Sequence, residues 1–443
     1  MLYLVIGAWT AAIAPFSAVI LHSRGIDTVT IGLLSAVAAL AATVLVPAWG
    51  HLADVLVGRT RAFQIGLAVA SLAAITLLLP LPPQVLAPIL ASFGVFPAMF
   101  QALGDAVAVD ALPEPERQYG TLRALASLSF AVGVIVAGFI YDQAGYAAVP
   151  LVSLGWSGLF FLLIARVPDR TRDPQARATA RRPAGGRTVG RFGSISLALS
   201  IQPRLWAVLV VFAVAYTGLM GAVIFVGIRI VELGGQPSDV ALSFGVASFA
   251  EIPGLVMAGW IVKRVGMRSL VAVALLAYGL CIASWGVLST PIAINATRVA
   301  TGLLFGALAA ARVLIVARLL PAELQATGQT MLQAATFGSG SALGGLVGGV
   351  LYGTFGPTVF FAVAGAMAIA GALGAWIVLG GPVGARHSYD PEVEATGRPQ
   401  PGAEPVTLML PAASRARAAV LRVPGPQETG EDIPPPGRPA SRP

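Results

Sequence analysis

Long apolar stretches, separated by short polar turns and prolines, occupy most of the chain up to residue 380. Each stretch holds roughly 20 mostly apolar residues, the number that an α-helix needs to cross the hydrocarbon core of a bilayer. About twelve stretches can be distinguished, with approximate limits 2–21, 30–52, 62–82, 84–112, 119–141, 147–166, 205–231, 239–262, 268–289, 292–320, 325–353 and 358–380. The pattern predicts an all-α membrane protein with twelve transmembrane helices.

The basic residues between these stretches are distributed unequally. When the N-terminus is placed in the cytoplasm, the outer loops contain Arg24 and little else. The inner loops then contain Arg59, Arg61, Arg117, Arg166, Arg170, Arg172, Arg177, Arg181, Arg182, Arg187, Arg191, Arg204, Lys263, Arg264, Arg268 and Arg318. By the positive-inside rule, this asymmetry predicts a multi-pass protein of the inner (plasma) membrane with both termini cytoplasmic.

Composition agrees with a chain that folds in lipid. Of 443 residues, 56% are hydrophobic and only 11% are charged, and the mean hydropathy is +0.82. Soluble domains carry roughly 25% charged residues, so a soluble fold is excluded. The net charge of +8 arises from arginines between apolar spans, which indicates membrane topology and no nucleic-acid partner.

Neither a disulfide nor a metal site is expected. Cys281 is the single cysteine and lies in an apolar stretch, while the three histidines, His22, His51 and His387, are scattered. Zinc and similar metals need three or four convergent ligands. We therefore expect no cofactor and no metal, and a monomer whose surroundings are the lipid bilayer.

Four regions are predicted. Residues 1–166 form the N-terminal six-helix bundle, 167–203 a cytoplasmic basic linker, 204–380 the C-terminal six-helix bundle and 381–443 a disordered, Pro-rich cytoplasmic tail. The chain is apolar from Leu2 and has no basic n-region. The N-terminus is therefore predicted to be the first span and not a signal peptide.

The two bundles show an internal repeat. Gly133, Gly138, Tyr141 and Gly145 recur 211 positions later as Gly344, Gly349, Tyr352 and Gly356, and Gly50 and Gly58 are matched by Gly259 and Gly266. Ordered matches in equivalent spans predict two pseudo-symmetric six-helix bundles with a binding cavity between them. Span eleven also carries two glycine stripes with a spacing of four residues, Gly340, Gly344 and Gly348 beside Gly345, Gly349 and Gly353. We interpret these stripes as close helix packing; the alternative is a smooth face that slides when the halves move.

The loop after span two reads Gly50-His-Leu-Ala-Asp54-Val-Leu-Val-Gly58-Arg59-Thr-Arg61. It resembles the signature loop of the major facilitator superfamily, G-x-x-x-D-x-x-G-R-x-R, with one additional residue before Gly58. The loop after span eight, Gly259-Trp-Ile-Val-Lys263-Arg264-Val-Gly266-Met-Arg268, is similar to the second copy. The resemblance implies the major facilitator fold and a conformational latch at these residues. An ordinary charged turn, with Asp54 capping a helix or pairing with an arginine, is the alternative.

Spans four and five resemble one branch of that superfamily. Asp105, followed by Tyr119-Gly-Thr-Leu-Arg123, looks like the lactose-permease-like and phenylpropionate- or nucleoside-symporter-like branch, in which an acid and an arginine stand at this separation. Glu251-Ile-Pro253 and Ala326-Thr-Gly-Gln329 resemble the same branch. The resemblance covers residues 1–380 and implies transport of a small solute.

Asp105 and Arg123 are each nine residues from Glu114, the centre of the turn between spans four and five. Both therefore lie about 13 Å from that turn in an antiparallel hairpin and can meet. A charge at this depth needs a partner or a wet cavity, because its insertion costs roughly 2.5–3.5 kcal/mol. Gln101 lies one helical turn from Asp105. We interpret the three residues as substrate contacts, and a structural pair that fixes the hairpin is the alternative.

Other charges lie deep in the second half. Glu251 has no basic partner within reach on its own span, so desolvation favours its neutral form and makes it a candidate proton carrier; a salt bridge to another helix is the alternative. Span ten carries Arg298, expected to snorkel outward, and the deeper Arg312, a candidate substrate contact. Arg229 and Glu232 are one turn apart and are predicted to pair.

These features predict a secondary active transporter that works by alternating access, with proton symport as the expected coupling. Basic residues outnumber acids within the spans, which favours an organic anion such as an aromatic acid; neutral sugars and nucleosides are alternatives. Span ten lacks the histidine and acid of lactose permease, so coupling through that pair is not supported.

Proton-coupled multidrug or metabolite efflux is the second hypothesis. An integral membrane enzyme is disfavoured because no nucleophile, phosphate-loop or histidine-cluster motif is present, and a receptor or scaffold with this fold is a further alternative.

Overall fold

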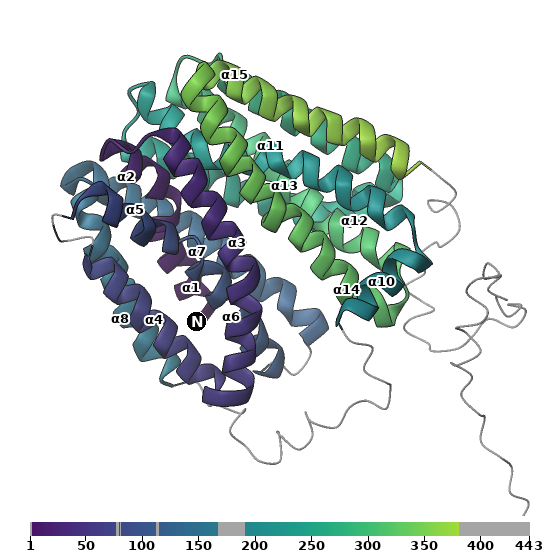
Figure 1. Ribbon diagram of the computed structural model, residues 1–443, viewed down its shortest axis with the longest axis horizontal. Helices are drawn as coiled ribbons and strands as arrows, with labels where there is room; N and C mark the ends of the chain where they lie inside the picture. The colour runs from purple at the N-terminus through teal and green to yellow at the C-terminus, as the bar shows by residue number, and fades with distance from the viewer. Residues whose placement is uncertain (1, 77–78, 80, 112–114, 167–190, 381–443) are drawn as a thin grey trace, which may run out of the picture. The chain divides into compact units, whose positions relative to one another are not determined.

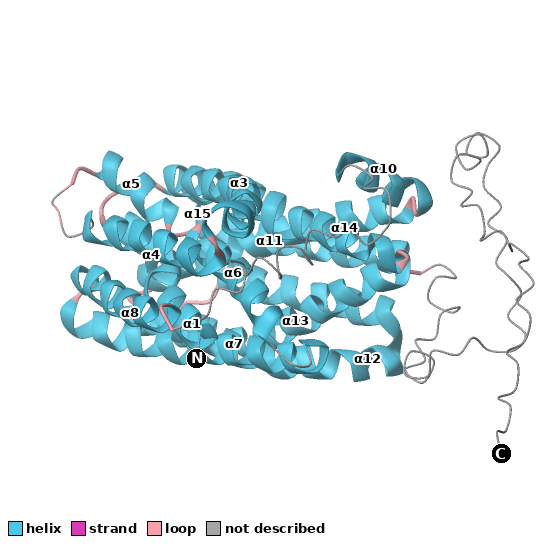
Figure 2. Ribbon diagram, turned by 90° about the horizontal axis from the view of Figure 1, so that it is seen from below, coloured by secondary structure: helices cyan, strands magenta, loops and turns pink. Residues whose placement is uncertain are grey.

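The computed structural model describes residues 2–76, 79, 81–111, 115–166 and 191–380 (Figure 1). These residues form helices joined by short turns, and no strand occurs among them (Figure 2). All of them belong to one compact unit, Met1–His387. The predicted tail, 381–443, and residues 167–190 of the predicted linker lie outside the described residues.

The first half contains the elements that correspond to predicted spans one to six. They are α1 (Leu2–Ile13), η1 (Ala14–Phe16), α2 (Ser17–Ser23), α3 (Thr28–Leu52), η2 (Ala53–Val57), α4 (Arg59–Thr76), α5 (Pro83–Ser92), α6 (Phe96–Ala111), α7 (Pro115–Ala144), η3 (Tyr146–Ala148) and α8 (Val149–Ile164). The segments η1 and η3 are 3₁₀ turns, and η2 is a π-helical turn.

The second half corresponds to spans seven to twelve. Its elements are α10 (Arg191–Ile201), α11 (Arg204–Glu232), α12 (Pro237–Trp285), α13 (Pro291–Leu319), α14 (Ala322–Gln333), the π-helical η5 (Ala334–Gly340) and α15 (Ser341–Val378). Helix α10 is the last part of the predicted linker and packs against α14.

Nine helical stretches of the described chain are long and apolar enough to cross a membrane. Two of them, Pro237–Trp285 and Leu324–Val378, have 49 and 55 residues, about twice the length that one crossing needs. Each contains a glycine in the left-handed conformation, Gly266 (φ 82°) or Gly356 (φ 80°), and therefore supplies two spans. With α4, which begins with two arginines, the described helices are consistent with the predicted twelve.

Predicted span four corresponds to one apolar stretch, Gln84–Asp105, that is interrupted: α5 ends at Ser92 and α6 begins at Phe96. Between them, the amides of Gly94 and Val95 bond to carbonyls only three residues back. Pro97 lacks the amide hydrogen that would bond to the carbonyl of Phe93 in a continuous helix. The proline therefore accounts for the break.

The repeat in the sequence corresponds to equivalent structural positions in the two halves. The hydroxyl of Tyr141 donates a hydrogen bond of 2.7 Å to the carbonyl of Ala12. Tyr352, 211 positions later, donates a bond of 2.7 Å to the carboxylate of Glu232. Each tyrosine thus ties the fifth span of its half to the first span of the same half.

Helices α3 and α12 also start in the same way. Asp27 caps α3 by accepting a 2.9 Å bond from the amide of Thr30, and these bonds from Thr30 lower the pKa of the Asp27 carboxyl group. Gln236, 209 positions later, caps α12 in a reciprocal capping box with Asp239. The two halves therefore begin their second span at matching residues.

Helix α3 shows how one span is divided between lipid and protein. The exposed side chains on its outer face are Val29, Leu33, Val37, Leu40 and Val44. Their spacing of three and four residues places them on one stripe. An apolar stripe of this length needs lipid around it, while Gly32 and Ala36 on the same helix are buried.

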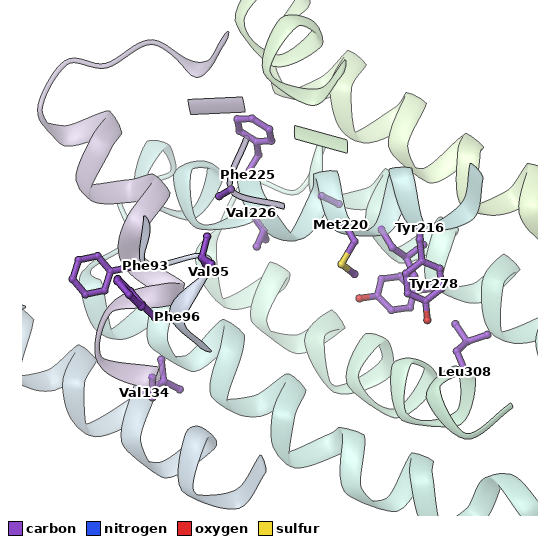
Figure 3. Packing of buried hydrophobic residues seen from close by; sticks show 14 of the residues in the cluster. Phe93, Val95, Phe96, Val134, Tyr216, Met220, Phe225, Val226, Tyr278 and Leu308 are labelled. Atoms are coloured by element: carbon purple, nitrogen blue, oxygen red, sulfur yellow. The ribbon is translucent and has the colours of Figure 1, made fainter. Parts of the chain in front are cut away.

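Aromatic rings fill the interior of each half. Trp9 is fully buried, contacts Phe100 edge-on at 5.1 Å, and donates its indole N–H to Ser157 at 2.9 Å. In the second half, the ring of Phe225 lies 5.4 Å from that of Tyr352 (Figure 3 shows Phe225). These contacts join helices within each half and do not cross the boundary between the halves.

Candidate functional site

The two halves meet along helices α3 and α15, which run side by side (Figure 1). A Cβ atom added to Gly32 would overlap the carbonyl oxygen of Gly345 and lie 2.9 Å from the Cα of Gly349. The hydroxyl of Thr28 donates to the carbonyl of Gly349 at 3.3 Å. The stripe of Gly345 and Gly349 therefore packs across the boundary between the halves. The neighbouring stripe faces its own half, because Gly344 packs against α11.

A second contact between the halves joins α7 and α12. A Cβ atom on Gly138 would overlap Ala241 and lie 3.0 Å from the Cα of Ser238. One helical turn after Gly138, the carboxylate of Asp142 accepts a 2.8 Å hydrogen bond from the backbone amide of Ser238, at the N-terminus of α12. Gly138 and Gly349 are repeat partners, so the two contacts are pseudo-equivalent.

Both contacts lie toward the end of the bundle that carries the turn at Gly25. We call this the Gly25 end, and we call the opposite end, with the turns at Gly58 and Gly266, the Gly58 end. A cavity of about 820 Å³ lies between the halves, lined along α3 from Ile31 to Pro47. The second half contributes Phe244 and Phe337 to its wall. The cavity therefore extends from the packed helices toward the Gly58 end.

Asp105 lines this cavity and accepts hydrogen bonds from Tyr3 and Gln101. The hydroxyl of Tyr3 donates to its Oδ1 at 2.6 Å, and the side-chain amide of Gln101 donates to the same atom at 2.7 Å. Gln101 also lines the cavity. Among the described lining residues, Asp105 alone is charged. An acid held by a phenol and an amide at the cavity wall is suited to contacting a polar solute.

The predicted partner Arg123 is in α7, but its side chain lies outside the described part of the structure. The predicted pairing with Asp105 is therefore not described. Tyr3, in contrast, is a partner that the sequence did not indicate. Its one signal was a hydroxyl in an otherwise apolar first span.

Arg312 lies behind the cavity wall. Its guanidinium donates to the hydroxyl of Thr336 at 3.0 Å and stands 4.8 Å from the ring centroid of Phe337, which lines the cavity. The ring of Tyr216 is 5.2 Å away on the other side. The predicted substrate contact is thus one aromatic ring away from the cavity.

The prediction that Arg298 snorkels outward is wrong, because only 4% of this residue is exposed. Its Nε donates to the carbonyl of Ser243 at 3.1 Å, and its guanidinium lies over the rings of Phe244 and Trp285 at 5.6 and 5.4 Å. Cation–π contacts with these two rings compensate the guanidinium for the hydration that it loses on burial. Side chains of spans eight and nine therefore replace the water that would solvate Arg298 at the surface.

Glu251 is half-buried on α12 and is not among the described residues that line the cavity. Its carboxyl group acts electrostatically on the hydroxyls of Tyr216 and Tyr278, which are also neighbours of each other (Figure 3). Arg312 acts on Tyr216 as well. Glu251 and Arg312 thus share Tyr216 as a neighbour, while Asp105 and Gln101 form a separate group at the cavity.

The predicted pair of Arg229 and Glu232 is confirmed, with a closest N–O distance of 3.6 Å. Arg229 also donates to the carbonyls of Trp285 and Leu288. Glu232 in turn accepts from Tyr352, as described above. These bonds link spans seven, nine and eleven at the Gly25 end.

The predicted latch contains an ion pair in its first copy. Nε of Arg59 lies 2.7 Å from the carboxylate of Asp54, across the left-handed turn at Gly58 (φ 88°). In the second copy, arginines stack on tryptophans: Arg264 over Trp260 at 4.6 Å and Arg268 over Trp376 at 3.8 Å. The other predicted latch residues, Gly50, Arg61, Gly259, Lys263 and Gly266, lie at or near the same two turns.

We expect Asp54→Asn to slow transport about tenfold if the Asp54–Arg59 pair stabilises one conformation, because one charge-assisted bond is worth roughly 1.5–3 kcal/mol. Initial transport rates in vesicles measure the effect. The matched control is Asp27→Asn, since asparagine caps helices as well as aspartate does. Equal rates for the two variants would contradict a latch role.

No group of three or more His, Cys, Asp or Glu side chains that could hold a metal occurs among the described residues. The described wall of the cavity is apolar apart from a few polar groups and one carboxylate, an arrangement suited to binding a small solute.

Comparisons with known proteins agree with this architecture. The nucleoside transporter NupG superimposes with a TM-score of 0.70 at 15% identity, over 86% of this chain and 97% of that one. The peptide transporter POT, in a complex with sulfate, gives 0.66 at 15% identity, over 86% and 94%. No curated protein matches the chain.

At such identities the two structures show the fold alone, and both belong to transporters. The description of the matching family model is "MFS_1 like family", and the match covers residues 1–363. That family and these neighbours are transporters and not enzymes. The chain therefore belongs to the MFS_1 like family and has a major facilitator-type transporter fold in the membrane.

Proposed function

We propose that this protein is a secondary active transporter that moves a small organic solute, preferably an organic anion, through the cavity between its halves in symport with protons. The observation that carries the proposal is the group of Asp105, Gln101 and Tyr3 in the wall of that cavity. Close helix packing between the halves lies toward the Gly25 end of the cavity, as expected for a carrier that closes one side at a time.

The orientation follows from the arginines in the loops. The turns at the Gly58 end carry Arg59, Arg61, Lys263 and Arg264, whereas those at the Gly25 end carry Arg24. By the positive-inside rule, the Gly58 end faces the cytoplasm. We therefore propose a carrier of the inner membrane with cytoplasmic termini, whose cavity releases the solute toward the cytoplasm.

Two acids are proposed to handle the proton. Asp105 lines the cavity, and Glu251 is half-buried on α12 within electrostatic range of Tyr216 and Tyr278. A carboxyl group that takes up and releases a proton during the transport cycle would couple solute movement to the proton gradient. Solute release toward the cytoplasm would accompany proton release from one of them.

Glu251→Gln is expected to abolish accumulation driven by a pH gradient and to preserve exchange of solute at equal pH on both sides. The amide keeps the shape of the side chain but cannot release a proton. Proteoliposomes that contain the purified variant allow both assays. Gradient-driven accumulation at the wild-type level would remove Glu251 from the coupling mechanism.

The direct test of the proposal is a solute screen in proteoliposomes with an imposed pH gradient. Organic anions, neutral sugars and nucleosides are offered separately, and the gradient is applied in either direction. We expect an organic anion to accumulate on the alkaline side and to leak back when an uncoupler collapses the gradient. Accumulation on the acidic side would identify the efflux antiporter instead, and movement that ignores the gradient would reject proton coupling.

A further inference from the structure

Two aromatic rings, Tyr216 and Phe337, lie against Arg312 behind the cavity wall, and a third, Phe305, packs against both of them. The ring of Tyr216 is 5.7 Å from that of Phe337, and Phe305 is 6.4 Å from Tyr216 and 6.3 Å from Phe337. Phe337 is the ring that faces the cavity, and Met220, one turn from Tyr216 on α11, lines the cavity too (Figure 3). A guanidinium is thus separated from the solute path by a single ring.

Two polar atoms in this pocket lack partners. Nε of Arg312 is buried and makes no hydrogen bond, and the hydroxyl of Tyr216, a fully buried residue, makes none either. Among the described residues, the hydroxyl of Thr336 is the one acceptor for the Arg312 guanidinium. The hydroxyl of Thr336 in turn donates to the carbonyl of Leu332 at 2.8 Å, which fixes its orientation.

Such unpaired atoms are costly and therefore informative. A buried donor without an acceptor loses roughly 1–3 kcal/mol, and most buried polar groups in proteins are paired. An unpaired N–H of a cation and an unpaired phenol hydroxyl in neighbouring side chains have the donor pattern that a carboxylate or phosphate oxygen would satisfy.

We propose that Arg312 and Tyr216 form the subsite that binds the anionic group of the transported solute, with Phe337 as its cover. This inference rests on the proposed function and names the residues that recognise the charge. Asp105 and Gln101 then contact the remainder of the solute from the opposite half. The ring of Phe337 moves aside when the carboxylate or other anionic group enters, and its contact with the guanidinium is exchanged for a stronger ionic bond.

The backbone around the cover is suited to such a movement. Phe337 and Thr336 belong to η5, the π-helical segment Ala334–Gly340. π-helical turns hold their hydrogen bonds less favourably than α-helical ones and occur often at functional sites. Gly338 and Gly340 lie within the segment, directly after Phe337, and add backbone freedom on that side of the ring.

Tyr216→Phe is the sharpest test, because the hydroxyl that it removes makes no bond within the protein. The substitution should leave thermal stability unchanged or slightly higher, and weaken anion binding about tenfold, as expected for one lost hydrogen bond to a charged group. The readout is the shift in melting temperature of the purified full-length protein with added benzoate. Benzamide, which has the same shape and no charge, serves as the neutral probe.

Arg312→Gln is expected to abolish the benzoate shift, and Arg312→Lys to restore it in part. Arg318→Gln removes the same charge from the end of the same helix, away from the pocket, and should bind benzoate like the wild type. Phe337→Ala is expected to strengthen benzoate binding, because the cover no longer has to move. The inference would be overturned if Tyr216→Phe, Arg312→Gln, Arg312→Lys and Phe337→Ala all keep the benzoate shift of the wild type. It would also be overturned if benzoate does not shift the melting temperature of the wild-type protein.

Binding and transport together distinguish this inference from the proposed function. Proton-driven transport of a solute that is insensitive to Tyr216→Phe and Arg312→Gln would reject the anion subsite and keep the carrier. A benzoate shift that depends on Tyr216 and Arg312, with no solute moved in the screen, would keep the subsite and reject the carrier.

Discussion

Asp105→Asn is expected to reduce proton-driven transport about a hundredfold, the largest effect that we expect from one substitution at the cavity. The carboxylate is the charged group of the described lining, and Tyr3 and Gln101 both donate to it. Loss of a charge-assisted bond costs roughly 1.5–3 kcal/mol, and asparagine also cannot carry a proton. Initial rates of solute uptake into proteoliposomes measure the effect.

Companion variants separate the charge from the hydrogen bonds that Tyr3 and Gln101 donate to it. Tyr3→Phe removes the phenol donor and should slow transport about tenfold, and Gln101→Leu removes the amide donor with a similar effect. Asp27→Asn introduces the same chemical change at the exposed cap of α3 and should leave transport unchanged. Wild-type rates in Asp105→Asn would show that the group at the cavity wall does not contact the solute.

Gly32→Leu is the second substitution with a large expected effect. Even a Cβ atom at this position overlaps the backbone of α15, so a leucine prevents the packing of α3 against α15 that seals the Gly25 end. We expect a folded protein that is held open at that end and whose transport rate falls at least about tenfold. Interiors packed this closely do not absorb an added side chain without displacement.

A single cysteine makes the measurement direct. With Cys281→Ala as background, Ser35→Cys places a thiol on α3 in the cavity wall. A membrane-impermeant thiol reagent added outside should label Ser35→Cys faster when Gly32→Leu is present. Gly158→Leu, at a helical glycine with nothing within 4 Å of its Cβ position, is the control. Unchanged labelling and transport in Gly32→Leu would contradict the contact between the halves.

Much of the fold was predictable because lipid imposes a simple requirement. Each span needs about 20 apolar residues whose backbone bonds are internal, and that pattern is visible in the sequence. The glycines that turn the chain at Gly145 and Gly356 were visible as a repeat for a similar reason. Only glycine adopts their left-handed conformation without strain.

The site was less predictable, because its contacts join residues that are distant in sequence. Gln101 and Asp105 are one helical turn apart, so their proximity follows from helix geometry. Tyr3 reaches Asp105 across 102 positions, and no local spacing indicates it. Arg298 was misplaced for the same reason, since its burial depends on Phe244 and Trp285 from another helix.

The packing of α3 against α15 at one end of the cavity could not be predicted from the sequence either. The stripe of Gly345 and Gly349 indicated a close approach of some helix, but not that α3 of the other half was the neighbour. Tyr216 and Arg312 were separate residues on two spans until the structure placed them beside Phe337. Partners on different helices are fixed by tertiary packing, which a single sequence does not specify.

The central claim is that the two ends of the cavity open in alternation. Two pairs of spin labels in the Cys281→Ala protein test it: Arg24→Cys with Val287→Cys at the Gly25 end, and Leu56→Cys with Val265→Cys at the Gly58 end. Electron–electron double resonance in nanodiscs at low and high pH then reports both distances. We predict that the Gly25-end distance lengthens as the Gly58-end distance shortens, in matching fractions of the population. Two distances that each keep one value under all conditions, or that lengthen together, would contradict alternating access.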